Sequence, residues 1–115
     1  MAILLSAAPL ASADEPAAPD KRQLIELLAG NSMRGIWAGR HYAQYFDADG
    51  LTLYREQDGP VTEGRWRVDD DGRYCSVWPP SDEWVCYQVL VSGMNIYWRA
   101  DGQYYPAEVE PGKLF

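Results

Sequence analysis

The chain contains four Asp-Gly dipeptides, at residues 49–50, 58–59, 71–72 and 101–102, and each separates segments rich in Tyr, Trp, Val and Thr. Asp-Gly favours the tight turns that join antiparallel strands, because both residues tolerate a left-handed backbone. With further turns at 79–82 and 92–95, the pattern predicts eight short strands near residues 34–39, 41–47, 51–57, 61–68, 73–78, 84–91, 95–99 and 103–109. No segment is long enough for the crossovers that parallel strands require. The sequence therefore predicts a mostly β fold: an antiparallel meander closed into a small, lipocalin-like barrel, or folded as a sandwich.

One helix is predicted before the strands, in the segment DKRQLIELLAGN at residues 20–31. Asp20 as N-cap and Gln23 three residues later form a capping-box pattern, and the leucines at positions 24, 27 and 28 give one apolar stripe. Gly30 is expected to end the helix in a left-handed conformation. Because so short a helix is unstable alone, we expect it to cover the core of its own domain, with a partner-binding helix as the alternative.

The two cysteines, Cys75 and Cys86, lie symmetrically about the predicted turn at 79–82. Directly opposed residues of an antiparallel pair have Cβ atoms about 4.5–5.5 Å apart, close to the separation that a disulfide needs. A metal site would need further Cys or His ligands nearby, and the single histidine is distant in sequence. The spacing therefore predicts a structural disulfide, with free thiols as the alternative and no bound metal.

The N-terminal residues 1–13, MAILLSAAPLASA, are apolar and end in an A-x-A pattern. This predicts a signal peptide that is cleaved before Asp14, although no Lys or Arg precedes the apolar run. The run is too short to span a membrane as a helix. We therefore expect a periplasmic or secreted protein with a linker at 14–19 and a single barrel domain at 20–115, in a compartment that permits a disulfide.

The net charge of −7 excludes nucleic acid as an expected partner, since phosphate binding requires a basic face. It favours a basic protein partner instead. The acidic turns in FDADG and VDDDGRYCSVW resemble fragments of a calcium-binding loop but lack the required ligands at the right positions, so turn formation explains them.

Aromatic residues make up 13% of the chain. About half can fit inside a small barrel, and the rest are expected to face outward as a recognition surface. The residues expected to bind a partner are Tyr45, Trp78, Trp84, Trp98 and Tyr104.

The sequence predicts no enzymatic activity and no cofactor. His41 has no Ser or Cys nearby that could act as a nucleophile, and no phosphate-binding loop, zinc signature or nucleophile elbow is present. We expect a binding module that is protein-binding or inhibitor-like, with a lipocalin-like carrier of a small apolar ligand inside the barrel as the alternative.

The ordered motifs LIELLAGNSMRGIW (24–37), YFDADG (45–50) and GRWRV (64–68), followed by the two cysteines, resemble a family of small exported proteobacterial proteins of unknown function. The resemblance implies a compact, β-rich exported domain and no catalytic residues. A looser likeness is to periplasmic inhibitors of lysozyme and of secreted proteases. The lysozyme inhibitors carry Ser-Gly-x-x-Tyr, whereas SGMNIY at 92–97 places its tyrosine one residue later.

Overall fold

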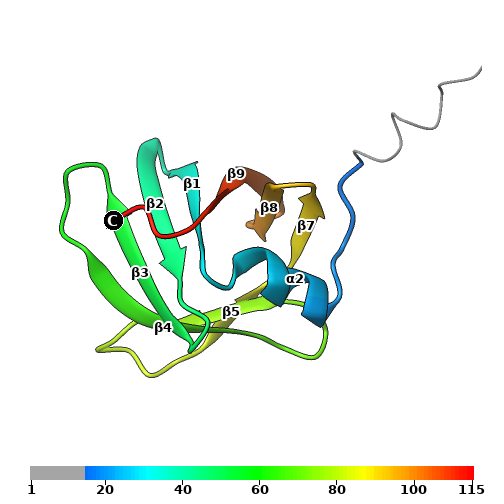
Figure 1. The fold of residues 1–115 in the computed structure, drawn as a ribbon, viewed down its shortest axis with the longest axis horizontal. Coiled ribbons are helices and arrows are strands. Elements are labelled where there is room, and N and C mark those ends of the chain that lie inside the picture. Colours follow the sequence, from blue (N-terminus) through cyan, green and yellow to red (C-terminus); the bar gives the residue numbers. More distant parts are fainter. Residues whose placement is uncertain (1–14) are drawn as a thin grey trace, which may run out of the picture.

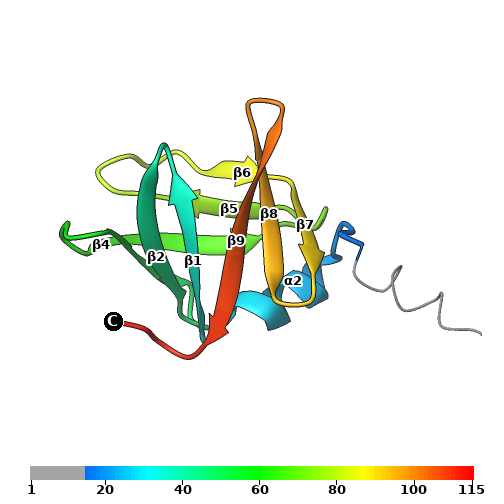
Figure 2. The ribbon, with the colours of Figure 1, turned by 90° about the horizontal axis from the view of Figure 1, so that it is seen from above.

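The computed structural model describes residues 15–115 and shows a mostly β domain with one helix. The elements are α2 (Lys21–Leu28), β1 (Asn31–Trp37), β2 (Arg40–Phe46), β3 (Leu51–Glu56), β4 (Thr62–Val68), β5 (Tyr74–Val77), β6 (Val85–Tyr87), β7 (Val89–Ser92), β8 (Asn95–Ala100) and β9 (Gln103–Pro111). All strand pairs are antiparallel, in the order β6-β5-β4-β3-β2-β1-β9-β8-β7. The sheet curls into a nearly closed barrel (Figures 1 and 2), so the predicted barrel is confirmed.

The predicted strand at 84–91 is wrong in one respect, because it is divided into β6 and β7 at Gln88. β6 pairs with β5 at one edge of the sheet, and β7 pairs with β8 at the other. The backbone N–H of Arg99 donates to the carbonyl of Gln88 at 3.0 Å, which marks the point where the segment changes partner. One continuous segment therefore supplies both edges of the sheet, and its bend gives nine strands in place of eight.

The helix covers one end of the barrel. Its predicted capping box is present: Gln23 N–H donates to the Asp20 carboxylate at 2.8 Å, and Asp20 N–H donates to the Gln23 side chain at 2.9 Å. Leu24 and Leu28 are fully buried beneath it. Figure 2 shows α2 at the opposite end of the strands from the β1–β2 and β8–β9 hairpins. The helix thus closes one end and leaves the other to the hairpin tips.

The helix ends at Leu28 with Ala29 as its C-cap, and Gly30 follows with a φ of 81°, the predicted left-handed conformation. Its N–H donates at once to the carbonyl of Phe46, at 2.7 Å. The first strand therefore begins at Asn31 and not near residue 34, because the ladder with β2 starts immediately after the helix.

Two hairpins at the open end have consecutive left-handed residues, Ala38 with Gly39 and Asp101 with Gly102. This backbone matches the twist of the flanking strands. In the turn that contains Asp58-Gly59 the residue with positive φ is Gln57. This Asp-Gly dipeptide therefore lies in a turn, but neither of its residues has a left-handed backbone.

The packed core occupies the half of the barrel next to the helix. Its buried members include Leu24, Leu28, Met33, Phe46, Trp66, Val68, Tyr74, Val89, Ile96, Ala107 and Val109. This packed cluster stabilises the barrel next to the helix. The cavity described below is lined mainly by other residues.

Residues 15–19 lie against the barrel, and Ala17 exchanges two backbone hydrogen bonds with Val91 of β7, at 2.9 and 2.8 Å. The predicted signal peptide at 1–13 and the predicted mature start at Asp14 lie outside the described residues. Within the described part of the chain, no helix is long and apolar enough to cross a membrane.

Candidate functional site: an aromatic pocket in the barrel mouth

A cavity of about 470 Å³ is lined by Trp37 and Ala100 among other residues. These two are the last residues of β1 and β8, at the hairpin end of the barrel, which lies opposite α2 (Figure 2). This volume is within the range of pockets that hold small molecules. We call it the mouth pocket. It is lined by Trp37, Tyr42, Gln44, Tyr54, Thr62, Glu63, Tyr74, Ser76, Trp78, Pro79, Tyr87, Trp98 and Ala100.

Two strand glycines make room for the walls of the mouth pocket. A Cβ on Gly35 would lie 2.6 Å from the hydroxyl of Tyr42, its partner across β1 and β2. A Cβ on Gly64 would lie 2.6 Å from Cε3 of Trp78 and 2.7 Å from the carbonyl oxygen of Val77. Glycine inside a strand is used for such close approach. Gly35 and Gly64 therefore let the two aromatic side chains lie flat over the backbone.

The aromatic walls hold one another in place. Tyr42 stacks on Tyr54, with ring centroids 5.4 Å apart, and Tyr54 meets Trp78 at 72° and 6.0 Å. On the other side Tyr74 meets Trp98 at 73° and 4.8 Å. Stacked and edge-to-face arrangements are the favoured geometries of aromatic pairs. The rings thus form connected walls at steep angles to one another.

Polar groups cross the base of the mouth pocket. The Gln44 side-chain amide donates to the Thr52 hydroxyl at 3.0 Å and to the Tyr74 hydroxyl at 3.1 Å. Thr52 in turn donates to the carbonyl of Tyr45 at 2.8 Å. Since buried polar groups are stable only when hydrogen-bonded, this chain of bonds fixes the base between the apolar core and the cavity.

One polar group in the wall lacks a partner. The indole N–H groups of Trp66 and Trp78 donate to the Asp47 carbonyl at 2.8 Å and to the Ser76 hydroxyl at 3.1 Å. The buried N–H of Trp98 has no hydrogen-bond partner among the described residues. The Tyr42 hydroxyl lies near enough for Trp98 to act against the rise that burial causes in the Tyr42 pKa, but the two groups do not reach the geometry of a hydrogen bond. A buried donor left unpaired costs about 1–3 kcal/mol, so a ligand that accepts from it would gain.

Tyr42, Tyr54 and Tyr74 of the mouth pocket stay protonated at ordinary pH. Burial raises the pKa of Tyr42 to about 12, and it also raises the pKa of Tyr74. The pKa of Tyr54 is raised first by burial and then by its hydrogen bond to Glu56, at 3.0 Å. These side chains therefore act as neutral walls and hydrogen-bonding groups.

The structure separates the five residues predicted to bind a partner. Trp78 and Trp98 line the mouth pocket. The other three lie elsewhere, and a cation of the chain sits over each ring: Arg67 over Trp84 at 4.1 Å, Arg99 over Tyr104 at 5.3 Å and Lys113 over Tyr45 at 5.5 Å. They do not line the mouth pocket.

Sequence reasoning did not select Trp37, Tyr42, Tyr54 and Tyr74, which complete the walls. Strand alternation already puts Tyr42 and Phe46 on the face opposite to Tyr45. Alternation does not predict which inward aromatic residues fill the core and which border a cavity, because that depends on where the helix closes the barrel.

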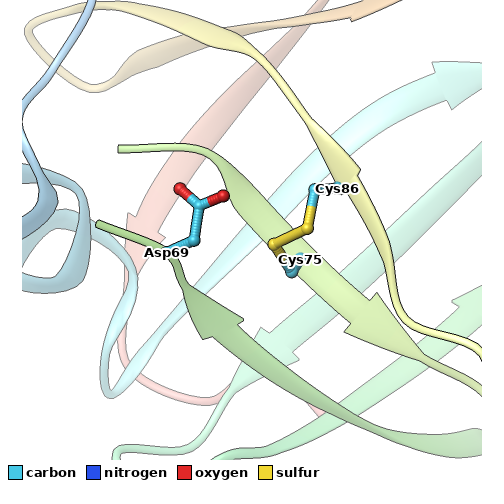
Figure 3. Close-up of side chains that lie close together, drawn as sticks. All are labelled: Asp69, Cys75 and Cys86. Atoms are coloured by element: carbon cyan, nitrogen blue, oxygen red, sulfur yellow. A yellow bond between two sulfur atoms is a disulfide. The ribbon is translucent and has the colours of Figure 1, made fainter. Parts of the chain in front are cut away.

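Asp69, Cys75 and Cys86 come together at the start of the β5–β6 hairpin (Figure 3). Their potential ligand atoms lie within 4.8 Å of one another. However, the two sulfur atoms are bonded to each other, and the predicted disulfide and its Cys75–Cys86 register are confirmed. The Asp69 carboxylate accepts from the backbone N–H of Asp71 at 3.0 Å, and from the backbone and side chain of Arg73 at 2.9 and 2.8 Å. This arrangement stabilises a corner of the fold and offers no free thiolate.

His41 is exposed on β2 and belongs to a different surface from the mouth pocket. Among the described residues, the ionisable side chains on the mouth-pocket lining are Glu63 and the tyrosines, so the site offers hydrophobic burial and hydrogen bonding.

No protein-family model, curated protein or solved structure matches this chain. The resemblance of its motifs to the exported proteobacterial family thus stays a prediction, and function has to be argued from the site.

Proposed function

We propose that this domain is a non-enzymatic binding module that holds a small, largely apolar ligand in the mouth pocket. The observation that carries the proposal is the cavity of about 470 Å³ with walls of Tyr and Trp at the open end of the barrel. Of the two binding modes expected from the sequence, this is the small-ligand carrier.

The polar groups of the pocket support a ligand with one oriented acceptor. Trp98 lines the pocket and its buried N–H is unpaired among the described residues, whereas the donors of Gln44 are already used by Thr52 and Tyr74. A few placed polar groups in an apolar cavity are typical of small-molecule sites, where they orient the ligand. The ligand therefore buries its apolar part among the rings and directs a carbonyl or hydroxyl oxygen to Trp98.

The protein-binding alternative has less support from the geometry. Tyr45, Trp84 and Tyr104 do not line the mouth pocket, and a cation of the same chain lies over the ring of each. A basic protein partner would have to displace these cations before it could use the aromatic faces.

We further propose that the domain works in the periplasm or outside the cell. The disulfide supports an oxidising compartment, and the pattern at residues 1–13 supports export. N-terminal sequencing of exported protein should begin at Asp14, and an intact Met1 on that material would contradict the export proposal.

Binding can be tested with the neutral dye N-phenyl-1-naphthylamine, titrated into the full chain while dye fluorescence is recorded. We expect saturable one-to-one binding. Ala100→Phe, at the pocket rim, should reduce the affinity by about tenfold or more, because the added ring occupies the cavity.

The matched control is Ala43→Phe, since Ala43 is also a half-buried strand alanine but does not line the mouth pocket. It should leave the dye affinity within about twofold. Absence of saturable binding to the folded chain, or equal losses from both variants, would overturn the proposal.

The role of Trp98 can be tested with two ligands of similar shape, 2-acetylnaphthalene and 2-isopropylnaphthalene. Only the ketone can accept from the indole N–H. Trp98→Phe should therefore weaken the ketone by about fivefold more than the hydrocarbon, as expected for one hydrogen bond of about 1 kcal/mol. Equal effects on the two ligands would exclude this orientation.

A further inference from the structure

We infer that the natural ligand of the mouth pocket carries a positive charge on an alkylated ammonium or similar organic cation. This inference rests on the proposed function and specifies the chemical class of the ligand.

The first argument is the kind of ring in the walls. Every aromatic residue of the lining is Tyr or Trp. These rings are rich in π-electron density, and cages built from them recognise organic cations such as quaternary ammonium groups. Tyr54 with Trp78, and Tyr74 with Trp98, meet at 72° and 73°, so ring faces are presented from different directions.

The second argument is the distribution of the chain's own cations. Outside the barrel, Arg67, Arg99 and Lys113 each lie over an aromatic ring. None of the residues that line the mouth pocket is Lys, Arg or His. Within the described structure, the aromatic faces of the pocket are therefore left without a cation from the chain, although cations cover rings on the outer surface.

The third argument is electrostatic. Among the described residues, Glu63 is the one carboxylate on the lining. Glu56 accepts from the Tyr54 hydroxyl but is paired with Arg40 at 3.0 Å, so that ion pair adds no net charge. With a net charge of −7, the field of the protein attracts a cation and disfavours an anion.

The decisive comparison uses two ligands of nearly the same shape, phenyltrimethylammonium and tert-butylbenzene, which differ in charge. The affinity of each ligand is measured by its displacement of N-phenyl-1-naphthylamine from the full wild-type chain. Despite its larger cost of leaving water, the cation should bind at least about tenfold more tightly, a difference of about 1.4 kcal/mol.

Variants should reduce this preference selectively. Tyr54→Leu removes a ring but keeps an apolar wall, so the cation should lose at least about fivefold while the hydrocarbon changes less. Trp84→Leu is the matched control, because Trp84 lies outside the mouth pocket, and it should leave the preference unchanged. The thermal midpoint of each variant shows whether it remains folded, and the wild-type comparison needs no variant.

Equal or tighter binding of tert-butylbenzene would overturn the charge inference while leaving the small-ligand function intact. Failure of both ligands in a chain that still binds the neutral dye would also overturn it. Failure of the dye as well would instead reject the proposed function, and the charge inference with it.

Discussion

Gly64 on β4 gives the sharpest test of how backbone packing shapes the mouth pocket. An added Cβ would lie 2.6 Å from a Trp78 ring carbon and 2.7 Å from the Val77 carbonyl oxygen, well inside the 3.4 Å at which ordinary contact begins. Val77 pairs with Arg65, the neighbour of Gly64. The carbonyl is backbone and cannot rotate away, so Gly64→Ala must move β5 against β4 and tilt Trp78.

The size of the effect follows from two opposing terms. Overpacking typically costs about 1–3 kcal/mol, and the backbone clash places this site near the upper value. Replacing glycine by alanine also reduces the conformational entropy of the unfolded chain, which stabilises the folded state by about 0.4–1 kcal/mol. We therefore expect Gly64→Ala to lower the free energy of unfolding by about 2 kcal/mol, or the thermal midpoint by about 8–16 °C in a domain of this size.

Thermal unfolding followed by circular dichroism and by tryptophan fluorescence measures this change. Gly35→Ala is the comparison, because there the three nearest atoms all belong to the far end of the Tyr42 side chain. That ring can tilt, so we expect a loss below about 1 kcal/mol. An unchanged or raised midpoint for Gly64→Ala would refute the reasoning that this glycine is required by close approach.

Three further predictions concern the rest of the domain. Cys75→Ser with Cys86→Ser should lower the free energy of unfolding by about 3 kcal/mol, from the loop entropy of a separation of 11 residues; dye binding should survive, and a loss of binding without a loss of stability would argue for a redox role. The pKa of Asp69 is lowered first by the backbone N–H of Arg73, so its carboxylate stabilises the fold above pH 3.8 and that stability is lost as the pH falls through the lowered value. Urea midpoints of wild type and Asp69→Asn should therefore differ at pH 7 and converge in acid, and a constant difference would contradict this. For Tyr42 the pKa is raised to about 12, so its contribution is complete below pH 10.0 and is lost as the pH rises towards 12; the wild-type midpoint should fall more steeply over that interval than that of Tyr42→Phe.

Local patterns were sufficient to predict most of the framework. The capping box at Asp20, the left-handed stop at Gly30 and the opposed cysteines each depend on residues close in sequence, and all three are present. The bend at Gln88 was missed, because it depends on the two sheet edges meeting in space. Nothing in the local pattern of residues 84–91 marks where one edge ends and the other begins.

The candidate site was harder to predict for a related reason. Trp78 and Trp98 were selected as aromatic residues in clusters, with no indication that they share a cavity with Tyr42 and Tyr54. Their convergence depends on barrel closure and on the two glycines that admit the rings. The unpaired N–H of Trp98 depends on hydrogen-bond geometry, which sequence does not contain.

The pairing of β1 with β9 has a consequence for the order in which the domain can be made. Asn31 lies opposite Pro111, and the Ser32 hydroxyl donates to the Gly112 carbonyl across 80 residues of sequence. One side of β1 therefore lacks its native partner until residues 107–111 of β9 have been synthesised. Contacts of such separation form late, since the long loop must close first. A nascent chain therefore cannot complete the β1–β9 seam of the barrel while β9 is missing, so closure of the barrel has to follow synthesis of both strands.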